Sequence, residues 1–319
     1  MPKCFEVSSF DNVYIEIYTM GFPIEGESIL TVLRDNDKIL FSFLIDSYKS
    51  GDVIPALEIA KNIHLEQLDY FFWTHPDHDH SLGIDEVLMT LDKEYRTRII
   101  LPEGMNKDLP LAQSARSSIE YINKHYNSGQ KYHSVSLLGV DDLCGLPTWS
   151  INFKEQCSEF ELPCRFTILA PHSSLIQRLE FTDSPSFNDF SLVLSMSWNS
   201  CTFLYTGDIS NRGIRILHDN QECEKYLKNI LYVKIPHHGS KSSNNLINYL
   251  SFLGTGEERA VSTLKKSNNI PDNNVLLSYQ KKINQNNVIV VGDRGTNADI
   301  CSLKYKLTDS QCLLQNIIL

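Results

Sequence analysis

Three apolar segments that are far apart in the sequence each end abruptly in histidine or aspartate. They are "LDYFFWTHPDHDH" (68–80), "FLYTGD" (203–208) and "YVKIPHHGS" (232–240). Short runs rich in β-branched and aromatic residues are typical of buried strands. Side chains placed at strand ends converge only if the fold brings those ends together. The feature therefore favours a fold in which three strand ends meet at one site.

The rest of the chain also has the pattern of short strands and helices, in two blocks. Strand character is predicted in the segments 12–20, 28–35, 38–46, 68–75, 164–174, 189–200, 201–210, 259–267, 287–293 and 299–307, helices at 52–63, 83–95, within 114–134, at 244–254 and at 273–283, and a helix followed by a strand within 222–240. The stretch from about 103 to 160 is polar and weakly periodic. This order predicts two packed sheet halves with helices outside, in one domain of residues 1–319. Two domains split near residue 150 are disfavoured, because neither half holds all the histidines and aspartates.

Composition limits the class of protein. With 319 residues, 42% of them hydrophobic, the chain can form a substantial core. Its net charge of −10 provides no global field that attracts nucleic acid. No apolar stretch approaches the roughly 20 residues of a membrane span, and no basic leader opens the chain, so we expect a cytoplasmic protein without membrane contact. The eight dispersed cysteines are expected to be reduced, with a Cys157–Cys164 pair as the less favoured alternative.

Imidazole and carboxylate groups are the ligands that zinc and manganese use. Several such groups on one tight turn would repel each other and would be costly to bury without a cation. Taken singly, the Gly-Asp at 207–208 is an ordinary turn, and the histidines at 75–80 could be exposed turn residues. Three strand ends of the same chemistry are hard to explain separately, so the sequence predicts a metal site.

These segments resemble a known family. The order His-x-Asp-x-Asp-His, then Gly-Asp, then His-His-Gly-Ser is similar to the metallo-β-lactamase superfamily, specifically the hydrolase domain of ComEC-type competence proteins. "GFPIEGESILTVL" with "FLIDS" resembles that family's opening, with Asp46 in the place of its aspartate; "NDFSLVLSM" matches at Asn188 and Ser191, and "KIPHHGSKSS" matches throughout. The resemblance extends over residues 12–305. It implies an α/β fold, the αββα four-layer sandwich.

The resemblance assigns ligands position by position. The commoner superfamily motif is His-x-His-x-Asp-His, but its third position here is Asp77, as in the ComEC-type variant. The implied ligands are His75 and Asp77 for one metal, and Asp79 and His80 for the second. His78 then points away from both metals.

A shifted frame beginning at His78 fails. That frame pairs His78 with His80 and requires an aspartate at position 82, where the chain has Leu82. The frame beginning at His75 also keeps a glycine in its expected place at position 83.

The remaining ligands come from the two later segments. The resemblance implies that Asp208 bridges both metals and that His238 completes the second site. Consecutive side chains leaving a strand diverge, so His237 is assigned to the substrate phosphate or the leaving group, although the two histidines could exchange roles. The last ligand of the first metal is either His172, favoured as the better ligand type, or Asn188.

One departure from the family concerns the substrate side. A Gly-His-Pro segment found near the end of many relatives is missing from "KKSNNIPDNN" (265–274). The role of its histidine is lost or is taken by Ser267, Asn268 or Asn269. Catalytic roles are expected for Asp79, Asp208 and His237, and substrate-binding roles for Ser240, Lys241, Asn188 and Asn269.

The implied cofactors are two divalent metal ions, Zn²⁺ or Mn²⁺. The implied reaction is hydrolysis of a phosphodiester in DNA or another nucleic acid by a hydroxide held between the metals. Phosphate could be guided by the lysines at 265, 266, 281 and 282, and the acidic chain suggests a short or single-stranded substrate or a protein partner that delivers it. The alternatives are a hydrolase of a small ester, amide or phosphocholine-like compound, and a catalytically weakened binding or effector subunit of a larger complex.

Overall fold

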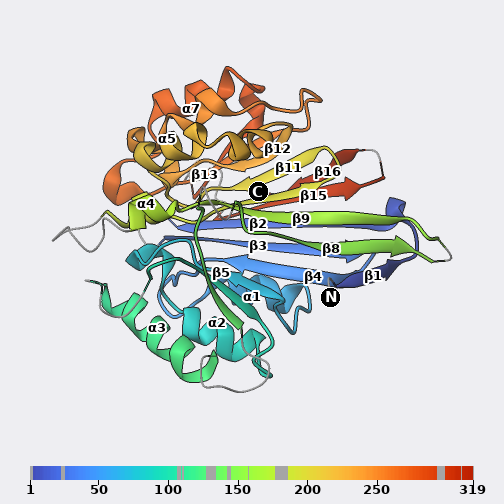
Figure 1. The fold of residues 1–319 in the computed structure, drawn as a ribbon, viewed down its shortest axis with the longest axis horizontal. Helices are drawn as coiled ribbons and strands as arrows, with labels where there is room; N and C mark the ends of the chain where they lie inside the picture. The colour runs from blue at the N-terminus through green and yellow to red at the C-terminus, as the bar shows by residue number, and fades with distance from the viewer. Residues whose placement is uncertain are drawn as a thin grey trace.

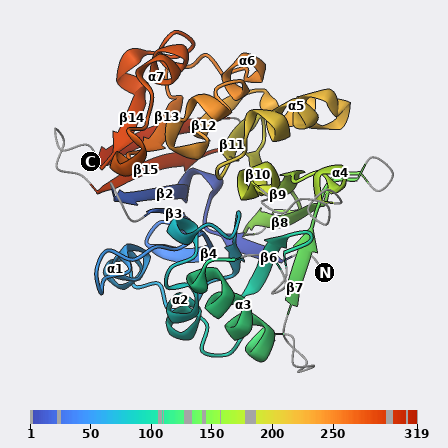
Figure 2. The same cartoon turned by 90° about the vertical axis from the view of Figure 1, so that its left-hand side faces the viewer.

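Two eight-stranded sheets form the centre of the protein, and helices cover their outer faces (Figure 1). The computed structural model describes residues 3–22, 26–105, 109, 111–126, 134–141, 145–156, 158–176, 186–292, 299–309 and 311–318. The four layers of helix, sheet, sheet and helix follow one another in both views (Figure 2). The αββα sandwich predicted from the sequence is confirmed.

The first sheet has the strand order β16-β15-β2-β3-β4-β5-β6-β7. Its strands are β2 (Val13–Phe22), β3 (Gly26–Asp35), β4 (Lys38–Ile45), β5 (Tyr70–Phe72), β6 (Arg98–Pro102), β7 (Ser134–Leu138), β15 (Ile300–Leu307) and β16 (Cys312–Ile318). The second sheet has the order β1-β8-β9-β10-β11-β12-β13-β14. Its strands are β1 (Cys4–Val7), β8 (Thr148–Glu155), β9 (Glu161–Ala170), β10 (Val193–Trp198), β11 (Cys201–Tyr205), β12 (Ile230–Lys234), β13 (Arg259–Thr263) and β14 (Val288–Val291).

The helices lie in two groups, one on each sheet. The first sheet is covered by α1 (Pro55–Asn62), α2 (Ile84–Leu91) and α3 (Gln113–Tyr126), and the second by α5 (Asn211–Asp219), α6 (Leu246–Tyr249) and α7 (Asn273–Gln280). A short α4 (Ser173–Ile176) follows β9. None of the helices in the described part of the chain is long and apolar enough to cross a membrane.

Strand periodicity explains the layers. Alternate residues of β2, such as Ile15 and Ile17, join the core between the sheets, while Met20 joins the core beneath the first group of helices. In β15 every second residue, including Leu303 and Tyr305, is buried between the sheets. Because successive side chains of a strand point to opposite faces, each central strand supplies two cores.

Both sheets contain strands from distant parts of the sequence. The C-terminal β15 pairs antiparallel with β2, and the N-terminal β1 pairs parallel with β8 of the second sheet. Strands β4 to β7 run parallel, and so do β11 to β14. The carboxyl ends of several parallel strands in both sheets are therefore available to carry functional loops.

Some elements differ from the sequence prediction. The stretch 103–160 contains β7 and β8, and the helix predicted at 244–254 is only the four-residue α6. The segment from 222 forms a 3₁₀ helix, Gln221–Leu227, before β12. Six cysteines with described positions are free thiols, including Cys164, whereas Cys157 lies outside the described residues.

Candidate metal centre

The three predicted segments leave the carboxyl ends of strands in both sheets. The segment 75–80 follows β5 of the first sheet, Asp208 follows β11, and the two histidines His237 and His238 follow β12. The start of β3 passes close to the first of these loops: Gly26 has φ 118°, and a Cβ there would lie 1.8 Å from the carbonyl oxygen of Asp79. Only glycine permits this close approach of β3 to the loop that carries Asp79.

Two histidines and two carboxylates lie close together where loops of the two sheets meet. His238 Nε2 lies 3.4 Å from Asp79 Oδ2 and 3.6 Å from Asp208 Oδ2. His80 Nε2 lies 3.7 Å and 3.5 Å from the same two oxygens. Ligands at 2.0–2.1 Å from a tetrahedral zinc ion are separated by about 3.3 Å. The spacing therefore matches a donor set around one cation.

Several buried atoms of this centre lack a hydrogen-bond partner among the described residues. They are the Nε2 atoms of His75, His80 and His238 and the Oδ1 atom of Asp208. A buried polar group without a partner costs about 1–3 kcal/mol. Four such atoms in one place indicate that the site is built to bind something that is not part of the polypeptide.

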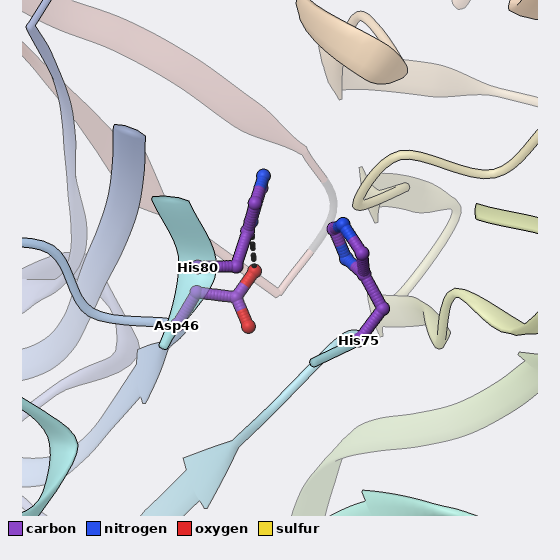
Figure 3. A group of neighbouring side chains, drawn as sticks. All are labelled: Asp46, His75 and His80. Carbon is purple, nitrogen blue, oxygen red and sulfur yellow. Dashed lines mark hydrogen bonds and ion pairs between the residues drawn. The ribbon is translucent and has the colours of Figure 1, made fainter. Parts of the chain in front are cut away.

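Asp46 fixes the orientation of two of these rings (Figure 3). Its carboxylate accepts from the backbone N–H and the hydroxyl of Thr74, both at 2.6 Å, and lies 2.8 Å from His80 Nδ1. Since a carboxylate only accepts, His80 Nδ1 carries the proton. The Thr74 hydroxyl gives its hydrogen to Asp46 and so accepts from His75 Nδ1, 2.9 Å away. In both histidines the Nε2 atom keeps a lone pair.

Glu27 imposes the same tautomer on His238. The Thr263 hydroxyl donates to Glu27 Oε2 and lies 2.7 Å from His238 Nδ1. Because its hydrogen is used by Glu27, Thr263 accepts from Nδ1–H, and His238 Nε2 has the lone pair. Glu27 Oε1 in turn is 2.8 Å from Lys234 Nζ, in a fully buried ion pair that links the two sheets.

Three Nε2 lone pairs thus face carboxylate oxygens, an arrangement that is repulsive unless a cation lies between them. In the metal-free protein, protonation of His80 relieves part of this repulsion. Burial alone would lower the pKa of His80, but Asp208 and Asp79 raise it well above its usual value. Conversely, His238 and His80 hold the pKa of Asp208 well below its ordinary value despite burial. Neutral imidazole held by an outer carboxylate is the usual arrangement of a metal-ligating histidine.

Not every nearby carboxylate is a candidate ligand. Asp46 lies within 4.8 Å of the His75 and His80 ring nitrogens, and Glu27 lies equally close to His80 and Asp208. The oxygens of both carboxylates, however, are already engaged by other protein groups. They orient the candidate ligands, whereas the Nε2 atoms of His80 and His238, which face Asp79, have no hydrogen-bond partner among the described residues.

A second group begins at His75, whose ring centroid lies 4.2 Å from that of His80. His75 Nε2 is 3.5 Å from Asp77 Oδ2, and the Asp77 side chain is 40% exposed. Ser191 accepts from the backbone N–H of Asp208 and lies 3.5 Å from His75 Nδ1. The buried Asn188 Oδ1 has no hydrogen-bond partner among the described residues. The expected donors of the first site therefore lie beside those of the second.

His237 lies further from Asp208 than His238 does, and its expected role at the substrate phosphate or leaving group stays a prediction. Its Nε2 lies 4.0 Å from Asp208 Oδ2, and its Nδ1 lies 3.0 Å from Ser242 Oγ. The two histidines are no longer in a strand: both have left-handed backbones, with φ of 49° and 50°. Such conformations are costly for non-glycine residues and concentrate at functional sites. The turn presents both rings to Asp208, and burial lowers the pKa of His237.

The other predicted residues lie further out. His172 has Nδ1 2.9 Å from Ser174 Oγ, and it belongs to none of the described groups of three ligand atoms within 4.8 Å. Lys241 is 73% exposed and 3.2 Å from Asp272, Ser240 caps the following turn, and Asn269 is exposed. His78 is exposed and 3.0 Å from Ser114 Oγ, away from the ligand atoms as expected.

Several residues that contact or orient the candidate ligands were not assigned from the sequence. Glu27 and Thr263 belong to β3 and β13, and Thr74 precedes the histidine motif by one residue. Lys265, one of four lysines suggested as a phosphate path, forms an ion pair with Asp79. The only sequence signal for these residues was a charged side chain within an otherwise apolar strand, at Glu27 and at Lys234. Such a residue indicates a buried ion pair but does not identify its partner.

Asp46→Asn tests the supporting network. A carboxamide has one acceptor oxygen, so its NH₂ group must face at least one of the donors that now point at Asp46. We expect Zn²⁺ affinity to fall by about 10- to 100-fold, the usual cost of losing an outer partner of a histidine ligand. The measurement is Zn²⁺ titration against a chromophoric chelator. The control is Asp35→Asn, which makes the same chemical change at the end of β3 that is away from Gly26 and the candidate metal centre. Unchanged affinity would contradict the role of Asp46.

Comparison with known proteins gives one similar curated sequence. ComE operon protein 3 of Bacillus subtilis (strain 168) is 29% identical over 199 residues, which cover 60% of this chain and 19% of that protein. The chain thus spans about a fifth of the length of this relative. No family model matches the chain.

Solved structures with a similar arrangement have low sequence identity. The metallo-β-lactamase fold protein YhfI from Bacillus subtilis is 12% identical, with a TM-score of 0.44 over 87% of this chain and 96% of its own. A diphosphatase from the PhnP family is 10% identical, with a TM-score of 0.45 over 95% and 99%. Zn²⁺-bound PqqB from Methylobacterium extorquens is 8% identical, with a TM-score of 0.40 over 88% and 98%.

Proposed function

We propose that this protein is a two-metal hydrolase of the metallo-β-lactamase superfamily, of the ComEC-type branch, and that it cleaves phosphodiesters in nucleic acid. The observation that carries the proposal is the set of three histidine lone pairs facing the carboxylates of Asp79 and Asp208. The branch is supported by the similarity to ComE operon protein 3 and by Asp77 at the third motif position.

Each ligand has an assigned place in this proposal. Asp79, His80 and His238 would hold the second metal, and Asp208 would contribute to both sites. His75 and Asp77 would hold the first, as the sequence motif implies. For its remaining ligand, the unpartnered buried oxygen supports Asn188, whereas the ring of His172 is engaged with Ser174.

Charge favours an anionic substrate. Two divalent cations balance the four carboxylates of Asp46, Asp77, Asp79 and Asp208, and Lys265 next to Asp79 makes the sum of these charges positive. The loaded centre is therefore cationic, within a chain whose net charge is −10. A local cationic site attracts a phosphodiester more strongly than a neutral ester or amide.

The chain's own residues then have distinct tasks. Bound divalent cations would lower the pKa of water and offset the charge of the phosphodiester. Asp208 and Asp79 fix the position of the reacting centre, because their backbones are held by Ser191 and by the close approach of Gly26. His237, 18% exposed and beside Asp208, is placed at the rim to contact a phosphate oxygen or the leaving group.

The test uses the purified protein stripped with a chelator and reloaded with Zn²⁺ or with Mn²⁺. We expect hydrolysis of bis(p-nitrophenyl) phosphate and of linear single- or double-stranded DNA, lost in the stripped protein and restored by one of the metals. Full occupancy without cleavage of any phosphodiester would overturn the proposal. Hydrolysis of p-nitrophenyl acetate alone would support a small-ester hydrolase instead.

A further inference from the structure

Lys265 carries the one positively charged side chain that contacts a proposed metal ligand within the described residues. It follows β13, and its backbone is anchored by hydrogen bonds with Ile270, at 2.9 Å from its N–H and 3.3 Å to its carbonyl. Its ammonium forms an ion pair with Asp79 Oδ2, and both side chains are mostly buried, at 17% and 12% exposed. The Lys265 side chain is therefore held at its backbone by Ile270 and at its ammonium by Asp79.

The oxygen that Lys265 contacts is also a donor atom of the proposed second site. Asp79 Oδ2 is the atom that lies 3.4 Å from His238 Nε2 and 3.7 Å from His80 Nε2. An ammonium and a divalent cation cannot both occupy this oxygen closely, because like charges a few ångströms apart repel strongly in a partly buried site. Lys265 and the metal therefore compete for Asp79.

The proposed function supplies the second half of the argument. Once cations bind Asp79 and Asp208, the ammonium loses its partner and faces a positively charged centre. A lysine side chain has a flexible four-carbon stem and three donors, so it can turn to an anion without movement of the anchored backbone. A phosphate oxygen at the metal centre is the anion that the proposed substrate brings there.

We propose that Lys265 is an internal counter-cation that pairs with Asp79 in the metal-free protein and is transferred to the substrate phosphate when the metal binds. The proposal rests on the proposed function for the identity of the anion, but not for the competition with metal. In this scheme one lysine opposes metal binding and then favours phosphate binding.

The metal arm compares Lys265→Met with the wild type by Zn²⁺ titration against a chromophoric chelator. Removal of the competing ammonium is expected to tighten Zn²⁺ binding about tenfold, or about 1.4 kcal/mol. Lys265→Arg keeps the charge and should bind Zn²⁺ no more tightly than the wild type. Lys228→Met, which removes an ammonium from the exposed pair with Glu224, is the control. Unchanged or weaker Zn²⁺ binding by Lys265→Met would overturn the competition.

The anion arm measures binding of inorganic phosphate to the Zn²⁺-loaded proteins by calorimetry. Lys265→Met should bind phosphate about tenfold more weakly than the wild type, and Lys265→Arg should stay close to it. Equal affinities in Lys265→Met and the wild type would overturn the transfer. Neither arm needs turnover, so a protein that cleaves no phosphodiester would refute the proposed function while this inference is still decided. Urea unfolding confirms that each variant is folded, and Lys265→Gln replaces Lys265→Met if that variant is not.

Discussion

If the protein is the proposed two-metal phosphodiesterase, replacing Asp208 by asparagine is expected to reduce metal binding from two ions to one or none and to lower hydrolysis by about 10³-fold or more. The side chain is 2% exposed, and its Oδ2 lies within 4.0 Å of the Nε2 atoms of His80, His237 and His238. An amide offers one neutral oxygen in place of two charged ones. It can neither bridge two cations nor offset their charge.

Metal content by elemental analysis and the metal-dependent rise in melting temperature are the two measurements. A ligand that binds only the folded state raises stability, so the wild type should melt higher with Zn²⁺ or Mn²⁺ present. This shift should largely disappear in Asp208→Asn. Asp219→Asn, an exposed aspartate at the end of α5, makes the same chemical change outside the centre and should retain metal and activity. An Asp208→Asn protein with full activity would rule out the proposed mechanism.

The candidate metal ligands could be proposed from the sequence because their spacing is local. Histidines and aspartates at alternate positions after an apolar strand, as in 75–80, retain their spacing in any fold that keeps the strand end. The same is true of Asp208 at the end of β11. The residues that orient the ligands could not be predicted, because Glu27, Lys234 and Thr263 meet only through the packing of two sheets.

The backbone conformation at His237 and His238 could not be predicted from the sequence. The expectation of diverging neighbours holds for a strand, but β12 ends at Lys234 and the two histidines lie in a left-handed turn. Sequence periodicity carries no signal for such a turn when the residues are not glycine. The prediction for the polar stretch 103–160 missed β7 for a related reason. This strand lies at the edge of its sheet and has few buried residues, so its apolar pattern is weak.

Lys234→Met is expected to destabilise the protein by about 3–5 kcal/mol, the usual effect of leaving a buried charge without its partner. Lys234 Nζ is 2.8 Å from Glu27 Oε1 and also donates to the carbonyl of Ile235 at 2.9 Å. Both side chains are at most 3% exposed. Without the ammonium, the Glu27 carboxylate would remain in the core behind His238, far from water. The measurement is the free energy of unfolding in urea, on metal-free protein at pH 7.

Two matched variants separate the cost of an unpaired charge from the value of an ion pair. Lys304→Met removes a 35% exposed lysine from Glu16, which keeps its 2.8 Å contact with Arg34, so a loss below about 1 kcal/mol is expected. The double variant Glu27→Gln with Lys234→Met removes both buried charges while leaving an oxygen for Thr263, and should recover most of the stability. If Lys234→Met were no more harmful than Lys304→Met, Glu27 would have to be protonated in the core. A protonated Glu27 would no longer be an obligatory acceptor for Thr263, and the His238 tautomer that leaves Nε2 free for metal would no longer follow from this network.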